Sequence, residues 1–162
     1  MKKVAIIMGS DSDWPILKPA YEILKEFEID AEILVASAHR NPNTVRNFVL
    51  NSEKQGIKIL IAGAGAAAHL PGVIASYTTL PVIGVPISSS VLKGLDALLS
   101  IVQMPSGIPV ATMAIDGGKN AGLFALSILS VEDKMIADKL TEFRENQIKQ
   151  VEEKNKAIQL NL

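Results

Sequence analysis

The N-terminal segment of the chain reads Val4-Ala5-Ile6-Ile7-Met8-Gly9-Ser10-Asp11, five apolar residues followed at once by glycine and polar side chains. An unbroken apolar run of this length is typical of a strand that is buried on both faces, as in a parallel sheet covered by helices. Short apolar segments recur along the chain, and the predicted strands are residues 4–8, 31–36, 58–62, 82–85 and 109–114.

Amphipathic segments separate these strands. After the first strand, apolar residues at spacings of three and four predict a helix through Trp14, Leu17, Ala20, Tyr21, Leu24 and Phe27. A second helix is expected from about Pro42 to about residue 55, where Gly56 ends it, and shorter helices over 70–77, 91–100 and 120–129. The alternation predicts an α/β fold, a three-layer α/β/α sandwich around a five-stranded parallel sheet. We expect the flavodoxin-like order, with strand one between strands two and three.

The last thirty residues differ from the rest. A stripe of apolar residues predicts a helix over 132–156 that is longer than a five-stranded sheet needs to cover it. We therefore expect one domain over 1–162, with an α/β core over 1–130 and a C-terminal helical extension over 131–162. The long helix is interpreted as an oligomer interface, and a solvated helix with frayed ends is the alternative.

Composition restricts the classes of function. Of 162 residues, 48% are hydrophobic and 20% charged, which is typical of a folded domain. Sixteen basic residues against seventeen acidic ones, with only three arginines, argue against nucleic-acid binding. The absence of cysteine excludes a disulfide framework and a thiolate metal site. No apolar run has the length of a signal peptide or a membrane span, so we expect a soluble, cytoplasmic protein without a membrane partner.

Glycines and polar residues follow the first three predicted strands. In an open parallel sheet, ligands bind beyond the carboxyl ends of the strands, where the strand order reverses. The three loops cover residues 9–14, 37–42 and 63–72, and they contain both histidines and Arg40. We expect these loops to converge on one cleft.

The first loop contains four residues that each favour a helix N-cap: Ser10, Asp11, Ser12 and Asp13. A helix needs one cap, so the remaining hydroxyl and carboxyl groups predict hydrogen bonds to a hydroxylated ligand. Capping alone is the alternative interpretation. Two carboxylates would repel a flavin phosphate, which argues against a flavin here.

In the second loop, Ser37 and Arg40 flank His39 just before a predicted helix N-terminus. Amide donors, a hydroxyl, a guanidinium and the positive end of a helix dipole together suit a phosphate group. An unperturbed imidazole titrates at about 6.5, so His39 is a candidate to donate and then recover a proton at neutral pH. A structural role for His39 is the alternative.

The third loop is rich in glycine and alanine and has almost no polar side chain before His69. Small residues let backbone amides approach a ligand closely while the surrounding wall stays apolar. Tight packing of a strand on a helix would explain the same composition. For His69, orienting a ligand and capping local structure stay equally open.

Four motifs occur in order along the chain. They are Gly-Ser-Asp-Ser-Asp-Trp at 9–14, Ser-Ala-His-Arg-Asn-Pro at 37–42, Ala-Gly-Ala-Gly-Ala-Ala-Ala-His-Leu-Pro-Gly at 62–72 and Ser-Ile-Val-Gln-Met-Pro-Ser-Gly-Ile-Pro-Val at 100–110. Together they resemble the class I PurE family, the N5-carboxyaminoimidazole ribonucleotide mutases of purine biosynthesis. The resemblance implies a homo-octamer whose active sites are shared between subunits, a small-molecule substrate, no metal and no organic cofactor.

The resemblance also implies roles for individual loop residues. His39, the candidate proton carrier, and Ser10 would lie near the transferred carboxylate, and Asp13 would bind the ribose hydroxyls. The 5′-phosphate would be held by Ser12, Ser37 and Arg40, with Ala38 among the substrate-binding residues of the same loop. The base and carboxylate pocket would be lined by Ala64, Gly65, His69 and Leu70.

Two features depart from the family pattern. Position 66 is alanine where many members have glycine, so its backbone is expected not to require a positive φ. The loop over 116–120 is shorter than in some members, so no substrate contact is assigned to it.

Three other kinds of protein compete with the mutase. The class II enzyme of the same fold carboxylates aminoimidazole ribonucleotide directly; it has Lys-Gly in place of Arg40-Asn41 and lacks the pattern His69-Leu70-Pro71. A receiver module needs an aspartate at the end of strand three and a lysine at the end of strand five, where this chain has Ala62-Gly63 and Ala114-Ile115. A flavin-binding module would be yellow, and we expect a colourless protein.

Overall fold

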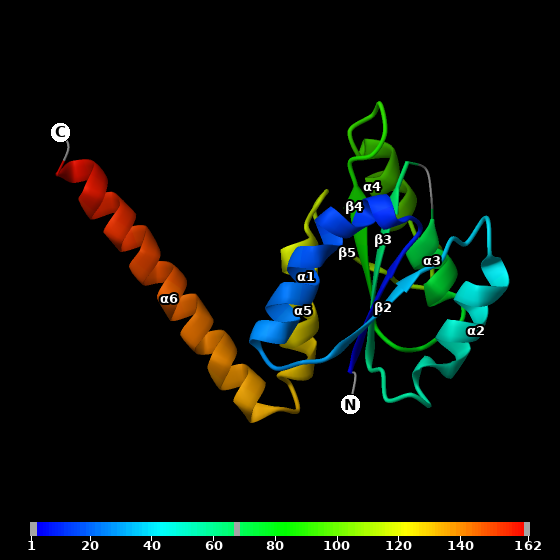
Figure 1. Ribbon diagram of the computed structural model, residues 1–162, viewed down its shortest axis with the longest axis horizontal. Coiled ribbons are helices and arrows are strands. Elements are labelled where there is room, and N and C mark those ends of the chain that lie inside the picture. The colour runs from blue at the N-terminus through cyan, green and yellow to red at the C-terminus, as the bar shows by residue number, and fades with distance from the viewer. Residues whose placement is uncertain (1–2, 67–68, 161–162) are drawn as a thin grey trace. The chain divides into compact units, whose positions relative to one another are not determined.

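The computed structural model describes residues 3–66 and 69–160. Within them, five parallel strands form one sheet in the order β2-β1-β3-β4-β5 (Figure 1). Strand one lies between strands two and three, which confirms the predicted flavodoxin-like order. The strands are β1 (Val4–Met8), β2 (Ala31–Val35), β3 (Ile59–Gly65), β4 (Val82–Ile87) and β5 (Ala111–Thr112).

The three central strands carry the most continuous apolar runs. Every residue of β1 and β4 is buried, and so is β3 as far as Ala64. β2, at one edge, has no buried residue. At the other edge β5 has two residues, whereas the sequence predicts a strand over 109–114. Pro109 has no backbone N–H to donate, which limits strand pairing there.

Helices cover both faces of the sheet (Figure 1). On one face, α2 (Pro42–Ser52), α3 (Leu70–Ala75) and α4 (Leu95–Val102) pack apolar side chains against β1, β3 and β4 in one cluster. On the other face, α1 (Trp14–Glu26) buries Leu17 and Leu24. The first turns of α5 (Gly118–Leu129) lie against α1. The two helices are so close that a Cβ added at Gly118 would lie 1.9 Å from the Ile16 carbonyl oxygen.

Most helix limits agree with the predicted ones, and two differ for local reasons. α4 begins at Leu95 instead of 91, because the preceding loop ends in two positive φ angles, 51° at Lys93 and 88° at Gly94. α5, predicted over 120–129, already begins at Gly118, so Asn120 lies in its first turn and does not cap it.

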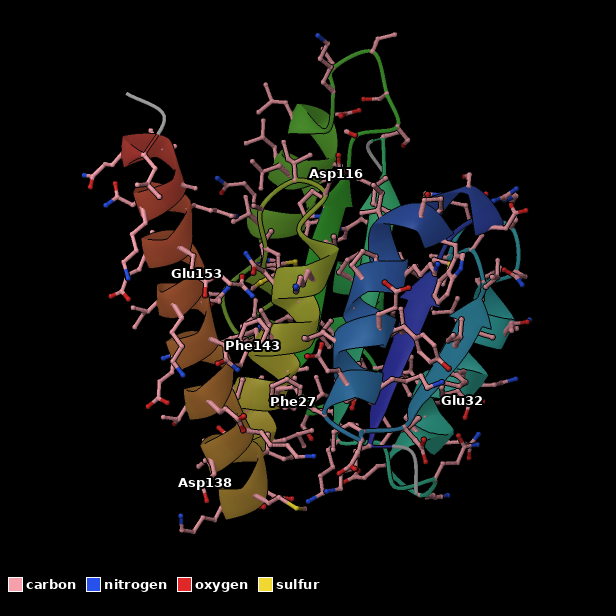
Figure 2. All side chains as sticks on the ribbon, turned by 60° about the vertical axis from the view of Figure 1, so that its left-hand side comes forward. Phe27, Glu32, Asp116, Asp138, Phe143 and Glu153 are labelled. Atoms are coloured by element: carbon pink, nitrogen blue, oxygen red, sulfur yellow. The ribbon has the colours of Figure 1, made fainter. Side chains whose placement is uncertain are left out.

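Residues 126–162 form a second compact unit. Its main element is α6 (Lys134–Gln159), predicted over 132–156 and capped by Asp133, whose Oδ1 accepts the Ile136 backbone N–H at 3.4 Å. Figure 2 shows the side chains that it carries, with Asp138 labelled in its first turns. Ile148 and Val151 on this helix are 59% and 65% exposed. None of the helices formed by the described residues is long and apolar enough to span a membrane.

Candidate functional site

The loop after β1 forms a 3-10 turn, η1 (Asp11–Asp13). Ser10 caps this turn: its Oγ accepts the Ser12 backbone N–H at 3.3 Å, and its backbone N–H donates to Asp13 Oδ2 at 3.1 Å. The side chains of Ser10 and Asp13 therefore both cap η1, whereas α1, which begins at Trp14, has no side-chain capping bond at its N-cap residue Asp13. The Ser12 hydroxyl donates to Ser10 Oγ at 2.9 Å, which holds the two hydroxyls side by side.

The carboxyl group of Asp13 is the one charged side chain classed as buried among the described residues, with the residue 6% exposed. Burial raises the pKa of this carboxyl above its ordinary value of 3.8, while the backbone N–H groups of Ser10 and Gly9 and the charge of Arg40 partly oppose the shift. A carboxylate in this position is suited to accept hydrogen bonds from a polyol such as ribose.

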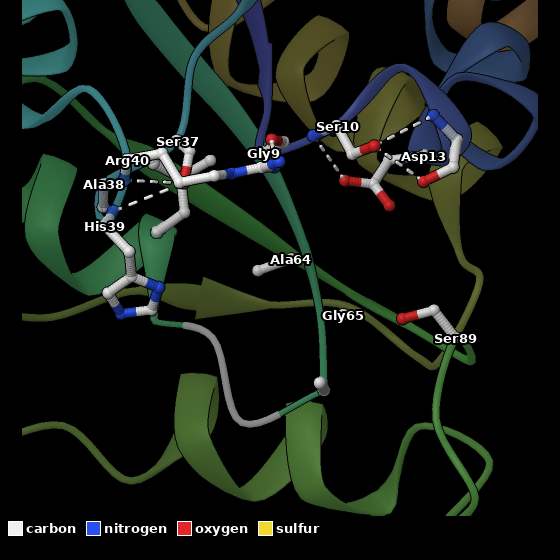
Figure 3. A pocket seen from close by; sticks show the side chains of 13 residues that line it. Gly9, Ser10, Asp13, Ser37, Ala38, His39, Arg40, Ala64, Gly65 and Ser89 are labelled. Carbon is white, nitrogen blue, oxygen red and sulfur yellow. Dashed lines mark hydrogen bonds between the residues drawn. The ribbon is translucent and has the colours of Figure 1, made fainter.

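The loop after β2 is organised by Ser37. Its Oγ accepts the backbone N–H groups of His39 at 3.3 Å and Arg40 at 3.2 Å, and its own N–H donates to Asn41 Oδ1 at 2.6 Å. These bonds form a tight turn just before α2, and the turn fixes the backbone of His39. Figure 3 shows the His39 imidazole at one side of the pocket.

Arg40 connects the first two loops. Its Nη2 donates to the carbonyl oxygen of Gly9 at 2.9 Å, across 31 positions of sequence. Arg40 lines two hollows, one of about 390 Å³ and a more open one of about 420 Å³. Since a guanidinium carries five N–H donors, this one bond leaves others to contact an anion.

The loop after β3 contains a backbone strain that was not expected. Ala66 has a φ of 52°, in the left-handed region, so the prediction that position 66 needs no positive φ is wrong. Ala66 lies in a turn directly after Gly65, the last residue of β3. A left-handed conformation costs a non-glycine residue about 1–2 kcal/mol. Positions 67–68, which complete the Gly/Ala motif, lie outside the described residues.

The three loops converge on one cavity of about 390 Å³ (Figure 3). Of the eleven residues predicted for the site, ten line it: Ser10, Ser12, Asp13, Ser37, Ala38, His39, Arg40, Ala64, Gly65 and Leu70. Gly9, Ala66 and Ser89 complete the lining. In the described part of the chain, no group of three or more His, Asp or Glu side chains is placed to hold a metal ion.

His69 is the predicted residue that does not line the cavity. It precedes α3, where its carbonyl oxygen accepts the Val73 backbone N–H at 3.0 Å and its side chain makes no capping bond. The imidazole ring of His69 lies against Gly72: a Cβ added at Gly72 would lie 1.9 Å from His69 Nε2. Among residues 3–66 and 69–160, its buried Nδ1 has no hydrogen-bond partner.

Ser89 is the polar lining residue that sequence reasoning missed. It follows β4, and the rule that ligands bind beyond the carboxyl ends of parallel strands applies to that strand as well. The triplet Ser88-Ser89-Ser90 directly after the apolar run 82–87 was the available signal.

Comparison with known proteins assigns the family. A protein-family model described as AIR carboxylase matches residues 3–150. The chain belongs to the AIR carboxylase family. Two curated relatives carry the name N5-carboxyaminoimidazole ribonucleotide mutase. The Thermotoga maritima protein is 55% identical over 98% of this chain and 93% of its own length; the Pyrococcus abyssi protein is 58% identical over 90% and 84%.

A solved structure agrees with this assignment to the AIR carboxylase family. The crystal structure of Treponema denticola PurE superimposes with a TM-score of 0.85 at 31% identity, over 96% of this chain and 98% of that one. The resemblance inferred from four short motifs is therefore confirmed, and so is the fold expected from it.

Proposed function

We propose that this chain is an isomerase that converts N5-carboxyaminoimidazole ribonucleotide into 4-carboxy-5-aminoimidazole ribonucleotide in purine biosynthesis. The observation that carries the proposal is the meeting of Ser10, His39 and Arg40 at one cavity in a member of this family. Curated relatives named for that mutase activity, at 48% to 58% identity, support the same conclusion.

The cavity offers separate groups for the parts of a nucleotide. Arg40, Ser37 and Ser12 supply a charge and hydroxyls suited to the 5′-phosphate, and Ser37 lies at the turn before α2. Asp13 would accept hydrogen bonds from the ribose hydroxyls. The base would then lie along Ala64 and Gly65 at the end of β3, with Leu70 and Ala38 completing its surroundings.

The reaction requires one group that first gives and then takes a proton. Protonation of the exocyclic nitrogen breaks its bond to the carboxyl carbon, which releases carbon dioxide and leaves an enamine-like carbon C4. C4 attacks the carbon dioxide to form the new carbon–carbon bond, and loss of the C4 proton restores the aromatic ring. We assign both proton transfers to His39, with Ser10 near the carboxylate.

The apolar wall suits a reaction that passes through free carbon dioxide. Ala64 is 2% exposed and Leu70 is 2% exposed, and both line the cavity. A wall without competing polar groups would keep carbon dioxide next to C4 and strengthen the polar contacts of the substrate. The proposal needs neither a metal nor an organic cofactor.

We further propose that the enzyme works as a cytoplasmic homo-octamer with active sites at subunit interfaces. Exposed apolar side chains support association: on α4, Leu95 and Leu99 are 52% and 50% exposed, and Val151 on α6 is 65% exposed. Light scattering tests this directly. A monomeric mass would contradict the interface role of α6.

Direct carboxylation of aminoimidazole ribonucleotide is the competing reaction. The test offers freshly made N5-carboxyaminoimidazole ribonucleotide without ATP or bicarbonate, and in parallel aminoimidazole ribonucleotide with bicarbonate, each followed by absorbance. Fast turnover of the first, with the second needing very high bicarbonate, is the expected result. Efficient use of the second substrate alone would make the enzyme a carboxylase and remove Arg40 and His69 as markers of the mutase.

A further inference from the structure

Three consecutive serines, Ser88, Ser89 and Ser90, follow β4, and the outer two are each held by a carboxylate. Ser88 donates its backbone N–H to Asp116 Oδ1 at 2.9 Å and its hydroxyl to Oδ2 at 2.5 Å. The hydroxyl of Ser90 donates to Asp96 Oδ1 at 2.8 Å. The hydroxyl of Ser89, which lines the cavity, makes no hydrogen bond within the described residues. Two locked serines therefore flank one whose hydroxyl is available.

The Ser89 hydroxyl lies directly over the end of β3. A Cβ at Gly65 would come within 1.9 Å of Ser89 Oγ and 3.0 Å of its Cβ, so the contact is possible only because position 65 is glycine. Figure 3 shows Ser89 and Arg40 on opposite sides of the pocket. Ser89 is thus on the side away from the guanidinium that is suited to a phosphate.

Asp116 fixes the start of the loop that carries Ser89. Its backbone N–H donates to the Pro86 carbonyl oxygen at 2.9 Å, while its carboxylate holds Ser88. Gly94, at the far end of the loop, packs against Ser88 and against Ile115, the neighbour of Asp116. A Cβ added at Gly94 would lie 2.7 Å from Ile115 Cγ2 and 3.2 Å from Ser88 Cα. Asp116, labelled in Figure 2, adopts a φ of 57°, which adds strain at this turn.

We propose that Ser89 contacts the substrate by donating its hydroxyl to the carboxylate at the reacting end, and that Asp116 is a positioning residue that acts through Ser88. The inference rests on the proposed mutase function. If the phosphate lies at Arg40 and the base along Ala64 and Gly65, the carboxylated edge of the base lies between His39 and Ser89, which line the cavity from opposite sides. A neutral hydroxyl donor there can pair with a carboxylate without repelling any part of an anionic substrate.

The first test separates the carboxylate from the rest of the ligand. Titration calorimetry measures binding of 4-carboxy-5-aminoimidazole ribonucleotide and of aminoimidazole ribonucleotide, which lacks the carboxylate, to the wild type, Ser89→Ala and the control Ser76→Ala. The Ser76 hydroxyl donates to the carbonyl oxygen of Val73 in α3, and Ser76 does not line the cavity. We expect Ser89→Ala to weaken binding of the carboxylated ligand roughly tenfold or more and to leave the affinity for aminoimidazole ribonucleotide unchanged. An equal loss of affinity for both ligands, or no loss for either, would contradict the proposed contact between Ser89 and the carboxylate.

The second test asks whether Asp116 acts through the serine loop. Asn and Gly both tolerate a positive φ, so Asp116→Asn and Asp116→Gly differ mainly in the bonds to Ser88, which Asn can still make with its amide. We expect Asp116→Asn to retain the wild-type kcat/KM and Asp116→Gly to lower kcat/KM several-fold. In a Ser89→Ala background, Asp116→Gly should cause no further loss. Additive losses would show that Asp116 does not act through Ser89.

Failure of this inference is distinguishable from failure of the proposed function. If the wild type does not convert N5-carboxyaminoimidazole ribonucleotide, the proposed function is wrong, and the inference fails with it. If the wild type is active and Ser89→Ala matches Ser76→Ala in kcat/KM and in both affinities, only the role of Ser89 is wrong.

Discussion

The guanidinium of Arg40 donates a hydrogen bond from Nη2 to the carbonyl oxygen of Gly9 at 2.9 Å, and so joins the loop after β2 to the loop after β1. β1 and β2 are neighbours in the sheet, which brings their carboxyl ends together. The same side chain lines the cavity. Arg40 thereby fixes the spacing of the two polar loops and presents its remaining donors to a ligand.

Arg40→Lys is expected to weaken binding of the 5′-phosphorylated product roughly tenfold or more. An ammonium retains the charge, but it cannot reproduce the planar fork that reaches Gly9 and a phosphate together. Titration calorimetry gives the affinity, and Arg46→Lys, on the exposed surface of α2, is the matched control. Equal affinities for the two variants would contradict a phosphate-binding role for Arg40.

The sequence was sufficient for the strand order of the sheet and for most of the residues that line the candidate cavity. The apolar run before Gly9 and the helix-opening Pro42 are local signals, and the order of strands follows from general rules for parallel sheets. Ala66 could not be predicted, because its φ depends on where β3 must turn toward α3. Ser89 was reachable by the same strand-end rule but has no motif of its own. The bonds of Asp116 to Ser88 join residues 28 positions apart, and sequence spacing carries no information on them.

The pH dependence of stability should change when Asp13 is replaced by asparagine. Burial raises the pKa of this carboxyl above 3.8 in the folded chain. Between 3.8 and the raised pKa, the folded state binds more protons than the unfolded state, so the free energy of unfolding falls as pH rises through that window. Asp13→Asn removes this titration, so its stability relative to the wild type should rise across the window and then stay constant.

Urea denaturation at a series of pH values measures the effect of Asp13→Asn. Asp30→Asn, an exposed position, controls for the loss of one negative charge. A stability difference that does not vary with pH between wild type and Asp13→Asn would contradict the raised pKa of Asp13.

Ala66→Gly is expected to stabilise the protein by up to about 1 kcal/mol. The substitution relieves a left-handed φ of 52°, a gain of about 1–2 kcal/mol, and glycine offsets part of this through the greater entropy of its unfolded state. Ala97→Gly in α4 should have the opposite sign and destabilise by about 1 kcal/mol or more. Chemical denaturation gives the free energy of unfolding of both variants. If Ala66→Gly lowered it as much as Ala97→Gly does, backbone strain at Ala66 would be ruled out.

Gly118→Ala is expected to destabilise the protein by about 1–3 kcal/mol, although alanine normally favours a helix over glycine. Gly118 begins α5, and a Cβ there would lie 1.9 Å from the backbone oxygen of Ile16 in α1. A backbone atom cannot move aside as a side chain can. Thermal unfolding of Gly118→Ala and of Asn120→Ala, an exposed position one half-turn later, separates the clash from helix propensity. Stabilisation by both substitutions would contradict close packing of α5 on α1.

His39→Asn is expected to retain the fold and nucleotide binding but to lose turnover by roughly 10²–10⁴-fold, since an amide hydrogen-bonds but cannot carry a proton between two sites. His39 is exposed, and its backbone is held by the N–H bond to Ser37 Oγ at 3.3 Å, which the substitution leaves in place. Circular dichroism and thermal unfolding check the fold, calorimetry with the product checks binding, and the absorbance assay gives kcat. A near-normal kcat would remove His39 from the proton transfers, whereas loss of product binding together with kcat would make it a binding residue instead.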